Sequence, residues 1–325
     1  MIEVKQISPT KANLKKFTQF QIDLYANNPY YVPPLVSDDV RTLNPADNPA
    51  FDFCEAAYFM AYRDRKPAGR IAGIINHQVN NDSRHKKARF GFVDFIDDPE
   101  VSAALFKAVE DWARGRGMKH LIGPLGFTDL DHEGMLVEGF EELGTMATIY
   151  NYPYYPQHIE RLGYRKESDW VEFIMDVPDG IPEKYARIAD IVRHKYKLRN
   201  LHYTSRRRIK DEYGRALFHL INEAYDGLYE YSHLSERQID YYISLYLDLL
   251  NLDLVSLVID ENDLLVGVGI SMPSMSRALQ KSRGKMLPFG WWHLLKGLKG
   301  KNDRVDLMLV AVRPEYQNKG VNALL

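Results

Sequence analysis

The chain has 325 residues, 45% of them hydrophobic, which is enough for about two globular domains with full cores. Its 42 Lys and Arg residues nearly balance 44 Asp and Glu residues, and the net charge of −2 excludes a protein built as a whole to bind polyanions. Cys54 is the only cysteine, which excludes an intrachain disulfide. The N-terminus has no apolar signal region and no apolar run is long enough to cross a bilayer, so we expect a cytoplasmic protein with no specific nucleic-acid partner.

The first half of the chain alternates between strand spacing and helix spacing. Ile2–Ile7 alternates apolar and polar residues as a half-buried strand does, and Ser8-Pro9-Thr10 signals the start of a helix. Asn27–Pro49 is rich in proline and predicts a long loop. The other predicted elements are paired strands at Ala57–Tyr62 and Gly69–Asn76, a strand at Phe90–Ile96, a helix through Val101–Trp112, a short strand at Leu121–Gly123, a helix beginning near residue 153, and a strand at Trp170–Val177.

The second half repeats this order after a plausible boundary at Pro178–Pro182. It begins with a helical linker at Lys184–Lys197 and a strand at His202–Lys210. The further predicted elements are helices at Tyr213–Tyr225 and Glu236–Leu250, strands at Leu254–Ile259 and Leu264–Met272, a compact segment at Leu287–Leu298, and a strand at Val305–Val312. We therefore expect two diverged copies of one α/β fold with a mixed sheet, in domains 1–178 and 201–325 joined by a linker helix at 179–200.

The segment Arg304–Leu325 carries the clearest functional signal. Its apolar run Val305–Val312 predicts a buried strand, which Pro314 ends because proline cannot donate to a sheet ladder. The next residues, Gln317–Asn322, form a glycine-containing turn that leads into a stretch of helical composition. A strand, a tight turn and a helix N-terminus together present backbone N–H groups to an anion, although an ordinary turn with a chance glycine has the same pattern.

This segment resembles motif A of the GCN5-related N-acetyltransferases (GNAT), a Gln/Arg-x-x-Gly-x-Gly/Ala signature that follows a strand. Gln317 and Gly320 match the signature, and Asn322 stands where the family prefers Gly or Ala. The resemblance implies acetyl-CoA, or another acyl-CoA, as co-substrate, with its pyrophosphate on the turn and its pantetheine arm along the strand. The residues implied are Leu309, Val310, Val312, Gln317, Asn318, Lys319, Gly320, Val321 and Asn322.

The resemblance also implies that the whole chain is a tandem GNAT protein whose second fold is incomplete at its C-terminus. The chain stops just after the motif A helix begins, before the helix on which many members carry a tyrosine acid. The first copy aligns FVDFIDDPE with LMLVAVRPE of the second, across a gap that removes the Tyr316–Gly320 turn. It has Ile159 near the position of the tyrosine acid. We expect the first copy to be a scaffold and the second to hold the cofactor.

The implied reaction is direct attack of an amine on the thioester, which makes an N-acetyltransferase acting on a small-molecule or peptide amine. Asp306 and Glu236 are candidates for the general base, with Glu230 as a further one. A cationic acceptor would suit an aromatic and acidic wall, although tyrosines packed on the core are the more ordinary interpretation. The wall residues are Tyr225, Tyr229, Tyr231 and Glu230.

Several alternatives stay open at this point. The chain could be a non-catalytic CoA-binding or partner-binding protein, or a transferase directed to aminoacyl or lipid acceptors, and a homodimer is possible. The glycine-rich loop from Gly123 to Tyr155 could hold an amine or only cap the first sheet. Pro288–Lys296 combines Trp and Lys as membrane-surface segments do, although a short buried helix over the acyl site is the favoured interpretation. His132-Glu133 lacks zinc-site spacing, and we expect no metal.

Overall fold

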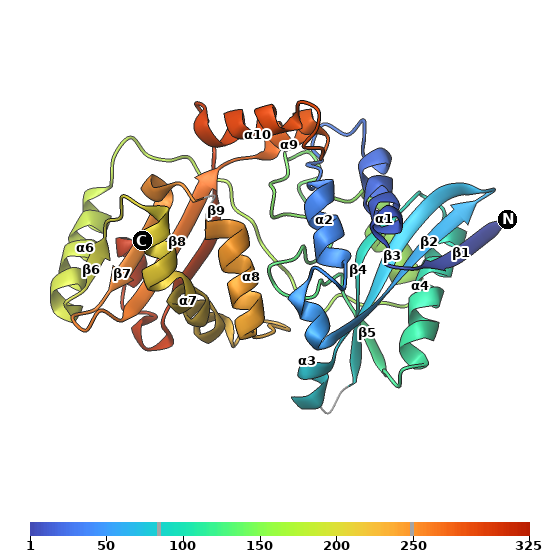
Figure 1. Ribbon diagram of the computed structural model, residues 1–325, viewed down its shortest axis with the longest axis horizontal. Helices are drawn as coiled ribbons and strands as arrows, with labels where there is room; N and C mark the ends of the chain where they lie inside the picture. The colour runs from blue at the N-terminus through green and yellow to red at the C-terminus, as the bar shows by residue number, and fades with distance from the viewer. Residues whose placement is uncertain (83–85, 248–249) are drawn as a thin grey trace. The chain divides into compact units, whose positions relative to one another are not determined.

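The computed structural model describes residues 1–82, 86–247 and 250–325, which form two compact units (Figure 1). The first unit comprises Met1–Asp169 with Ser274–Lys301, and the second comprises Trp170–Pro273 with Asn302–Leu325. Each unit is therefore built from two pieces of chain, whereas the sequence predicts continuous domains. The helix predicted as a linker, α6 (Glu183–Tyr196), packs within the second unit, where it buries Val192.

The sheet of the first unit has strand order β1-β2-β3-β4-β5. Its first three pairings are antiparallel, and β4 and β5 pair in parallel. The strands are β1 (Ile2–Ile7), β2 (Cys54–Arg63), β3 (Lys66–Asn76), β4 (Lys87–Phe95) and β5 (His120–Ile122). The helices are α1 (Lys11–Leu24), α2 (Val36–Leu43), η1 (Pro49–Asp52), α3 (His77–Asp82), α4 (Pro99–Arg114), α5 (Tyr154–Arg161), α9 (Ser276–Ser282) and α10 (Gly290–Lys299).

The period of two along β2 builds a core on each face of this sheet. Tyr58 and Met60 belong to the cluster that contains buried residues of α1, whereas Ala57 and Phe59 belong to the cluster that contains buried residues of α4. Each large apolar side chain buried in this way contributes about 1.5–3 kcal/mol. The helix predicted through Val101–Trp112 is confirmed as α4.

The sheet of the second unit has strand order β6-β7-β8-β9, with antiparallel pairing throughout. Its strands are β6 (Arg199–Leu201), β7 (Val255–Ile259), β8 (Leu265–Pro273) and β9 (Val305–Val312). Its helices are α6, α7 (Arg206–Tyr225), α8 (Glu236–Tyr246), η3 (Leu252–Leu254), η4 (Pro314–Tyr316) and η5 (Val321–Leu324). Among the described residues β9 is an edge strand, so one of its backbone edges is open for further pairing.

One face of the second sheet lies under α6 and the short helix η5. Val192, Val312 and Val321 pack together there. The strand glycine Gly267 makes this approach possible, because a Cβ at that position would lie 3.4 Å from both Val321 and Leu325. The chain after β9 therefore crosses its own sheet, which fixes the position of the turn between the strand and η5.

Several predicted elements are wrong. The apolar segment Trp170–Val177 forms no strand, because in the described part of the chain no strand pairs with it. The strand predicted at His202–Lys210 is wrong, because β6 ends before it, at Leu201, and its basic run Arg206–Arg208 is the first turn of α7. The loop predicted at Asn27–Pro49 contains the helix α2.

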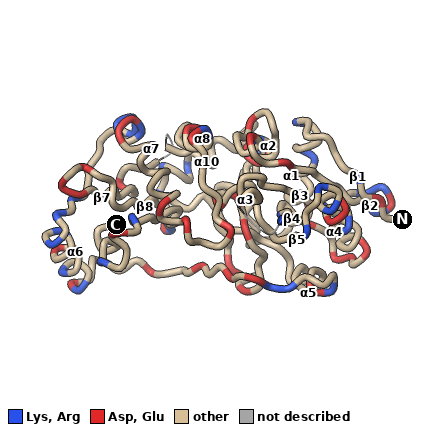
Figure 2. The backbone as a smooth tube through the Cα atoms, turned by 90° about the horizontal axis from the view of Figure 1, so that it is seen from below, with Lys and Arg blue, Asp and Glu red and all other residues tan. Residues whose placement is uncertain are grey.

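Acidic and basic residues are interspersed along both units, as the small net charge leads one to expect (Figure 2). Within residues 1–82, 86–247 and 250–325, no helix has both the length and the apolar character needed to span a membrane.

Candidate functional site

The strand β9 and the turn that follows it have the geometry of a backbone-lined site. Opposite β8, the register skips Met308, which makes a β-bulge in the middle of β9. Past η4 the chain turns through two residues with positive φ, Asn318 (60°) and Gly320 (81°). Asparagine and glycine are the residues that adopt this conformation most readily, so the sequence suits the turn.

The turn also contains backbone donors that could bind a ligand. In the part of the chain that the structure describes, the N–H groups of Gly320, Val321 and Asn322 donate no hydrogen bond, as is usual in the first turn of a helix. Gln317 Nε2 donates to the carbonyl of Val312 at 3.1 Å, which ties the turn to the end of β9. Lys319 Nζ lies 5.3 Å from the ring centroids of both Tyr196 and Tyr316. These groups fit an anionic phosphate ligand.

The predicted aromatic wall lies directly beside the predicted cofactor strand. Tyr225, the last residue of α7, donates its hydroxyl to the carbonyl of Val310 in β9 at 2.9 Å. Its ring contacts Tyr231 at a centroid distance of 5.9 Å, and Tyr231 donates to Asn222 Oδ1 at 2.8 Å. Burial raises the pKa of Tyr225, so its hydroxyl stays protonated and acts as a donor.

The remaining predicted wall residues follow in the same connection between α7 and α8. Tyr229 contacts Trp170 at 5.7 Å between ring centroids. Glu230 has a positive φ of 54°. The structure thus brings Tyr225 and Tyr231 together, while Tyr229 packs on the segment that precedes α6.

The two predicted bases lie in different places. Asp306 is at the start of β9, four residues before Val310, which corresponds to roughly 13 Å along a strand. The pKa of Glu172 is raised mainly by burial and further by the negative charge of Asp306. Glu236 begins α8 and pairs with Arg215 Nη1 at 2.5 Å and His219 Nε2 at 3.3 Å, on an exposed surface. Their roles as bases stay predictions.

The first unit contains a counterpart of the aromatic pair, 200 positions earlier in the chain. Tyr25 lies at the end of α1 as Tyr225 lies at the end of α7, and each is followed six positions later by a second tyrosine, Tyr31 or Tyr231. The rings of Tyr25 and Tyr31 lie 4.7 Å apart. Tyr25 donates its hydroxyl to Asp94 in β4 at 3.1 Å, just as Tyr225 reaches β9. The repeated Tyr-x5-Tyr spacing could have revealed this pair, and the sequence analysis missed it.

Around Tyr25 the first unit buries a charged network. Arg70 Nε donates to Asp94 Oδ2 at 2.7 Å, and their side chains are only 1% and 3% exposed. The hydroxyls of Tyr25 and Tyr155 lie 2.7 Å apart, and the N–H of Phe95 donates to Tyr155 at 3.0 Å. The backbone donor at the end of β4 is therefore bonded within the protein.

The helix that follows β4 is also closed to an anion. The side chain of Asp98 caps α4 and accepts a hydrogen bond from the N–H of Glu100 at 3.0 Å. Arg63 Nη1 lies 3.0 Å from the same carboxylate. A helix N-terminus that already holds a carboxylate repels a phosphate group.

No protein-family profile matches the chain. It is 30% identical to Protein YghO of Escherichia coli over 314 residues, which cover 94% of this chain and 78% of that protein. The chain belongs to the YghO family. Another relative, named "Bacterial ceramide synthase" and found in Caulobacter vibrioides, is 28% identical over 95% of this chain and 80% of its own length.

The fold of this YghO-family chain has a solved counterpart. A tandem GNAT protein from the clavulanic acid biosynthesis pathway matches 100% of this chain and 83% of its own, with a TM-score of 0.50 and 12% identity. This match confirms the predicted tandem GNAT fold, and it carries no information about the substrate.

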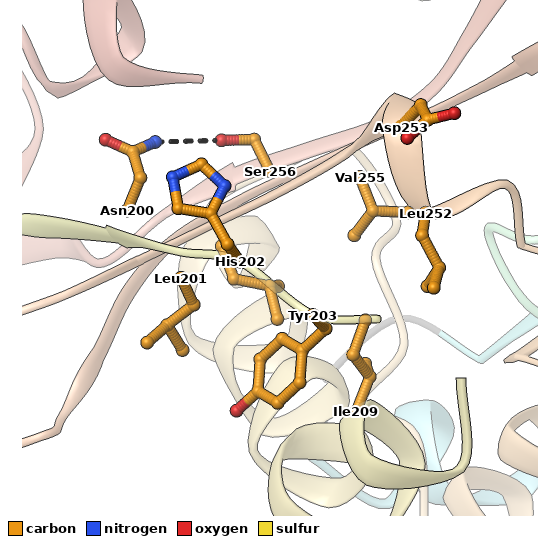
Figure 3. A pocket seen from close by; sticks show the side chains of 10 residues that line it. Asn200, Leu201, His202, Tyr203, Ile209, Leu252, Asp253, Val255 and Ser256 are labelled. Carbon is orange, nitrogen blue, oxygen red and sulfur yellow. Dashed lines mark hydrogen bonds between the residues drawn. The ribbon is translucent and has the colours of Figure 1, made fainter. Parts of the chain in front are cut away.

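Two cavities in the second unit of this YghO-family chain lie apart from the β9 edge. One, of about 330 Å³, is lined by residues of β6 and β7, including Asn200 and Ser256, and by His202, which follows β6 (Figure 3). Asn200 Nδ2 donates to Ser256 Oγ at 3.2 Å across it. The other, of about 740 Å³, opens between α6 and η5. Since β6 and β9 are the two edges of the sheet, the β6–β7 cavity is separate from the site at β9.

The glycine-rich loop of the first unit holds a carboxyl group whose charge state depends on folding. Burial raises the pKa of Glu133 from its ordinary 4.5 to about 8, with further contributions from Asp129 and Asp131. The folded chain therefore binds more protons than the unfolded chain between these two pH values. Its stability should fall as pH rises through this window, by up to about 1.4 kcal/mol per pH unit.

Replacing Glu133 with glutamine should remove this part of the pH dependence. Urea unfolding at about pH 5 and about pH 9 measures it, since the stability contribution is complete below pKa 4.5 and absent above the folded value. Glu138→Gln, exposed on the same loop, is the matched control. An unchanged pH dependence in Glu133→Gln would show that this carboxyl is ionised in the folded chain.

Proposed function

We propose that this protein is an acyl-CoA-dependent N-acyltransferase and that its second unit holds the acyl-CoA. The hydrogen bond from Tyr225 to the Val310 carbonyl carries the proposal, because it joins the aromatic wall to the strand that resembles the cofactor strand of GNAT enzymes. A second observation supports the proposal: at the turn, the N–H groups of Gly320–Asn322 donate no hydrogen bond within the described part of the chain.

Each part of this site has a role in the proposed reaction. The turn binds the pyrophosphate, and the open edge of β9 binds the pantetheine arm. Asp306 accepts a proton from the ammonium group of the acceptor, which leaves a neutral amine. The amine nitrogen then forms a bond to the acyl carbon, and a backbone N–H near Leu309–Val310 stabilises the developing oxyanion. The carbon–sulfur bond breaks, and the second proton lost by the nitrogen passes to the sulfur, so CoA leaves as its thiol.

In this proposal the first unit is a scaffold. Its strand-end donor, Phe95 N–H, is already bonded to Tyr155. The N-terminus of α4 is already capped by Asp98. Beyond β5, the N–H of Leu125 donates to the carbonyl of Phe90 at 2.8 Å, so the chain fills the space beside β4. In the first unit, the positions at which CoA would bind are therefore already occupied by contacts within the protein.

A second candidate concerns the acceptor. The relative with 28% identity over 95% of the chain is named a ceramide synthase, and a ceramide is the amide of a long-chain amino-alcohol. This observation favours a long-chain lipid amine, and a fatty acyl-CoA donor, over a small or peptide amine with acetyl-CoA. A CoA-binding protein without transferase activity is the remaining alternative.

The proposal predicts amide formation by the purified chain. Acetyl-CoA and a long-chain acyl-CoA are each supplied with a polyamine, an amino sugar or a long-chain amino-alcohol, and release of the CoA thiol and the amide product are measured. Tyr225→Phe should lower turnover, because the strand loses the hydroxyl that positions Val310. Tyr203→Phe, a tyrosine elsewhere in the unit whose hydroxyl bonds Glu212, is the control. CoA binding without turnover for any pair would favour the non-catalytic alternative, and neither binding nor turnover would refute both.

A further inference from the structure

The hairpin formed by α9 and α10 exposes an unusual number of large apolar side chains. Leu287 and Phe289 are 75% and 72% exposed, and Trp291 and Trp292 are 47% and 50% exposed. Only Gly290 and Leu294 of α10 are buried. The favoured interpretation from the sequence, a short buried helix, is therefore wrong for this segment.

Basic side chains surround these apolar ones. Between residues 281 and 301 the sequence has no Asp or Glu, and its basic residues are Lys281, Arg283, Lys285, Lys296, Lys299 and Lys301. Lys296 Nζ lies 5.5 Å from the ring centroid of Trp292, so the charge and the aromatic ring share one surface. We call residues 285–299 of this surface the α10 patch.

The hairpin is held to the first unit by its other side. Gln280 Nε2 donates to the carbonyls of Pro29 and Tyr31 at 2.8 and 3.0 Å, and Val36 N–H donates to the Gly284 carbonyl at 2.9 Å. Ser276 Oγ donates to the Gly144 carbonyl at 2.8 Å. Since α9 supplies this attachment, the exposed rings of α10 have no evident part in it.

The packing of α10 on α9 also places the patch outward. A Cβ at Gly297 would lie 2.9 Å from Ala278 and 3.2 Å from the sulfur of Met275, so this small residue allows close packing of the two helices. With that face occupied, the tryptophans and lysines remain on the solvent side.

We propose that the α10 patch docks the protein on the surface of an anionic lipid bilayer. Tryptophan and phenylalanine partition into the headgroup boundary of a membrane, and lysines around them are attracted to anionic headgroups while their stems cover apolar surface. An anionic lipid surface can therefore bind both the aromatic and the basic side chains, and it needs no surface complementary in shape to the patch.

A second copy of the chain fits the patch less well. In a symmetric dimer the same patch lies on both sides of the interface, and its lysines would face each other without a carboxylate from the patch between them. Charge complementarity therefore favours an anionic bilayer over self-association. This inference needs no catalytic activity and stands apart from the proposed acyl transfer.

Sedimentation of the full chain with vesicles tests the apolar part of the patch. The chain should bind vesicles that contain phosphatidylglycerol and not vesicles of phosphatidylcholine alone. Trp291→Ser/Trp292→Ser should reduce the binding at least about tenfold, since two exposed aromatic anchors are lost. Trp170→Ser, at a tryptophan that is 53% exposed in the second unit, should bind as well as the wild type.

Charge reversal tests the basic part. Lys296→Glu/Lys299→Glu should weaken binding to the anionic vesicles at least about tenfold, and added salt should weaken the wild type in the same way. Lys15→Glu/Lys16→Glu makes the same change of net charge on the exposed side of α1 and should have little effect. Circular dichroism confirms that each variant is folded.

Three results would overturn the proposal. One is equal binding to neutral and anionic vesicles. Another is equal loss in the patch variants and their controls, which would place the lipid contact elsewhere. The third is absence of binding to the anionic vesicles. A dimer, seen by analytical ultracentrifugation, that Trp291→Ser/Trp292→Ser dissociates would then make the patch an interface between copies.

Discussion

Replacing Arg70 with leucine will lower the free energy of unfolding of the first unit by about 3–5 kcal/mol. The change leaves the Asp94 carboxylate, whose side chain is 3% exposed, without its buried cationic partner. Burial already raises the pKa of Asp94 against the opposing effect of Arg70, so the lone carboxyl will take up a proton at a higher pH. Hydrogen exchange of the β3 and β4 amides measures the loss within this unit alone.

The double variant Arg70→Leu/Asp94→Leu separates the two parts of this effect. With both charges removed, most of the lost stability should return, because well-packed apolar residues can replace a buried ion pair at little net cost. Arg63→Leu breaks the pairs that this surface residue makes with Asp98 and Glu100 and should cost less than about 1 kcal/mol. A double variant that is less stable than either single variant would contradict this account of the network.

Replacing Asn322 with aspartate will weaken binding of CoA to the second unit by about 10- to 100-fold. The two side chains have nearly the same shape, so the change adds a negative charge beside the N–H groups of the turn with little change in packing. An aspartate in the first turn of a helix does not weaken that helix. Calorimetric titration with CoA at low and high salt measures the loss, which salt should partly reduce.

Asn322 is a better position for this test than Gly320, because of the structure around Gly320. A side chain at Gly320 would meet Val192 of α6 at 3.1 Å, in addition to the strain of a φ of 81°. Loss of binding in a Gly320 variant would therefore report on folding as well as on the ligand. Asn262→Asp makes the same isosteric change on the exposed turn between β7 and β8 and is the control. Equal CoA affinity in Asn322→Asp and the wild type would place the phosphates elsewhere.

Local patterns were sufficient to predict most strands and helices. The alternation in β2 and the helical spacing along α4 are each set by which face of one element is buried, and this can be read from neighbouring residues. Trp170–Val177 is rich in apolar residues without forming a strand, because pairing depends on a partner that the segment's own residues do not specify.

The candidate site was predictable in part for the same reason. The turn at Gln317–Asn322 is a local motif, and the aromatic wall follows a predicted helix. The contact between them, from Tyr225 to Val310, joins residues 85 positions apart and is visible only in the fold. The network of Arg70 and Asp94 was missed because each residue alone is a single charge inside an apolar strand.

Because the first unit is built from two pieces of chain, it cannot complete its fold as soon as its sheet has been synthesised. Residues 1–169 form its sheet, yet the carbonyls of Pro29, Tyr31 and Gly144 have their side-chain donors on α9, after the strands β6–β8 of the other unit. During synthesis, therefore, the first unit receives α9 and α10 only after more than half of the second unit has been made. A single proteolytic or genetic cut cannot release either unit whole, and a fragment that ends before residue 274 lacks both α9 and the α10 patch.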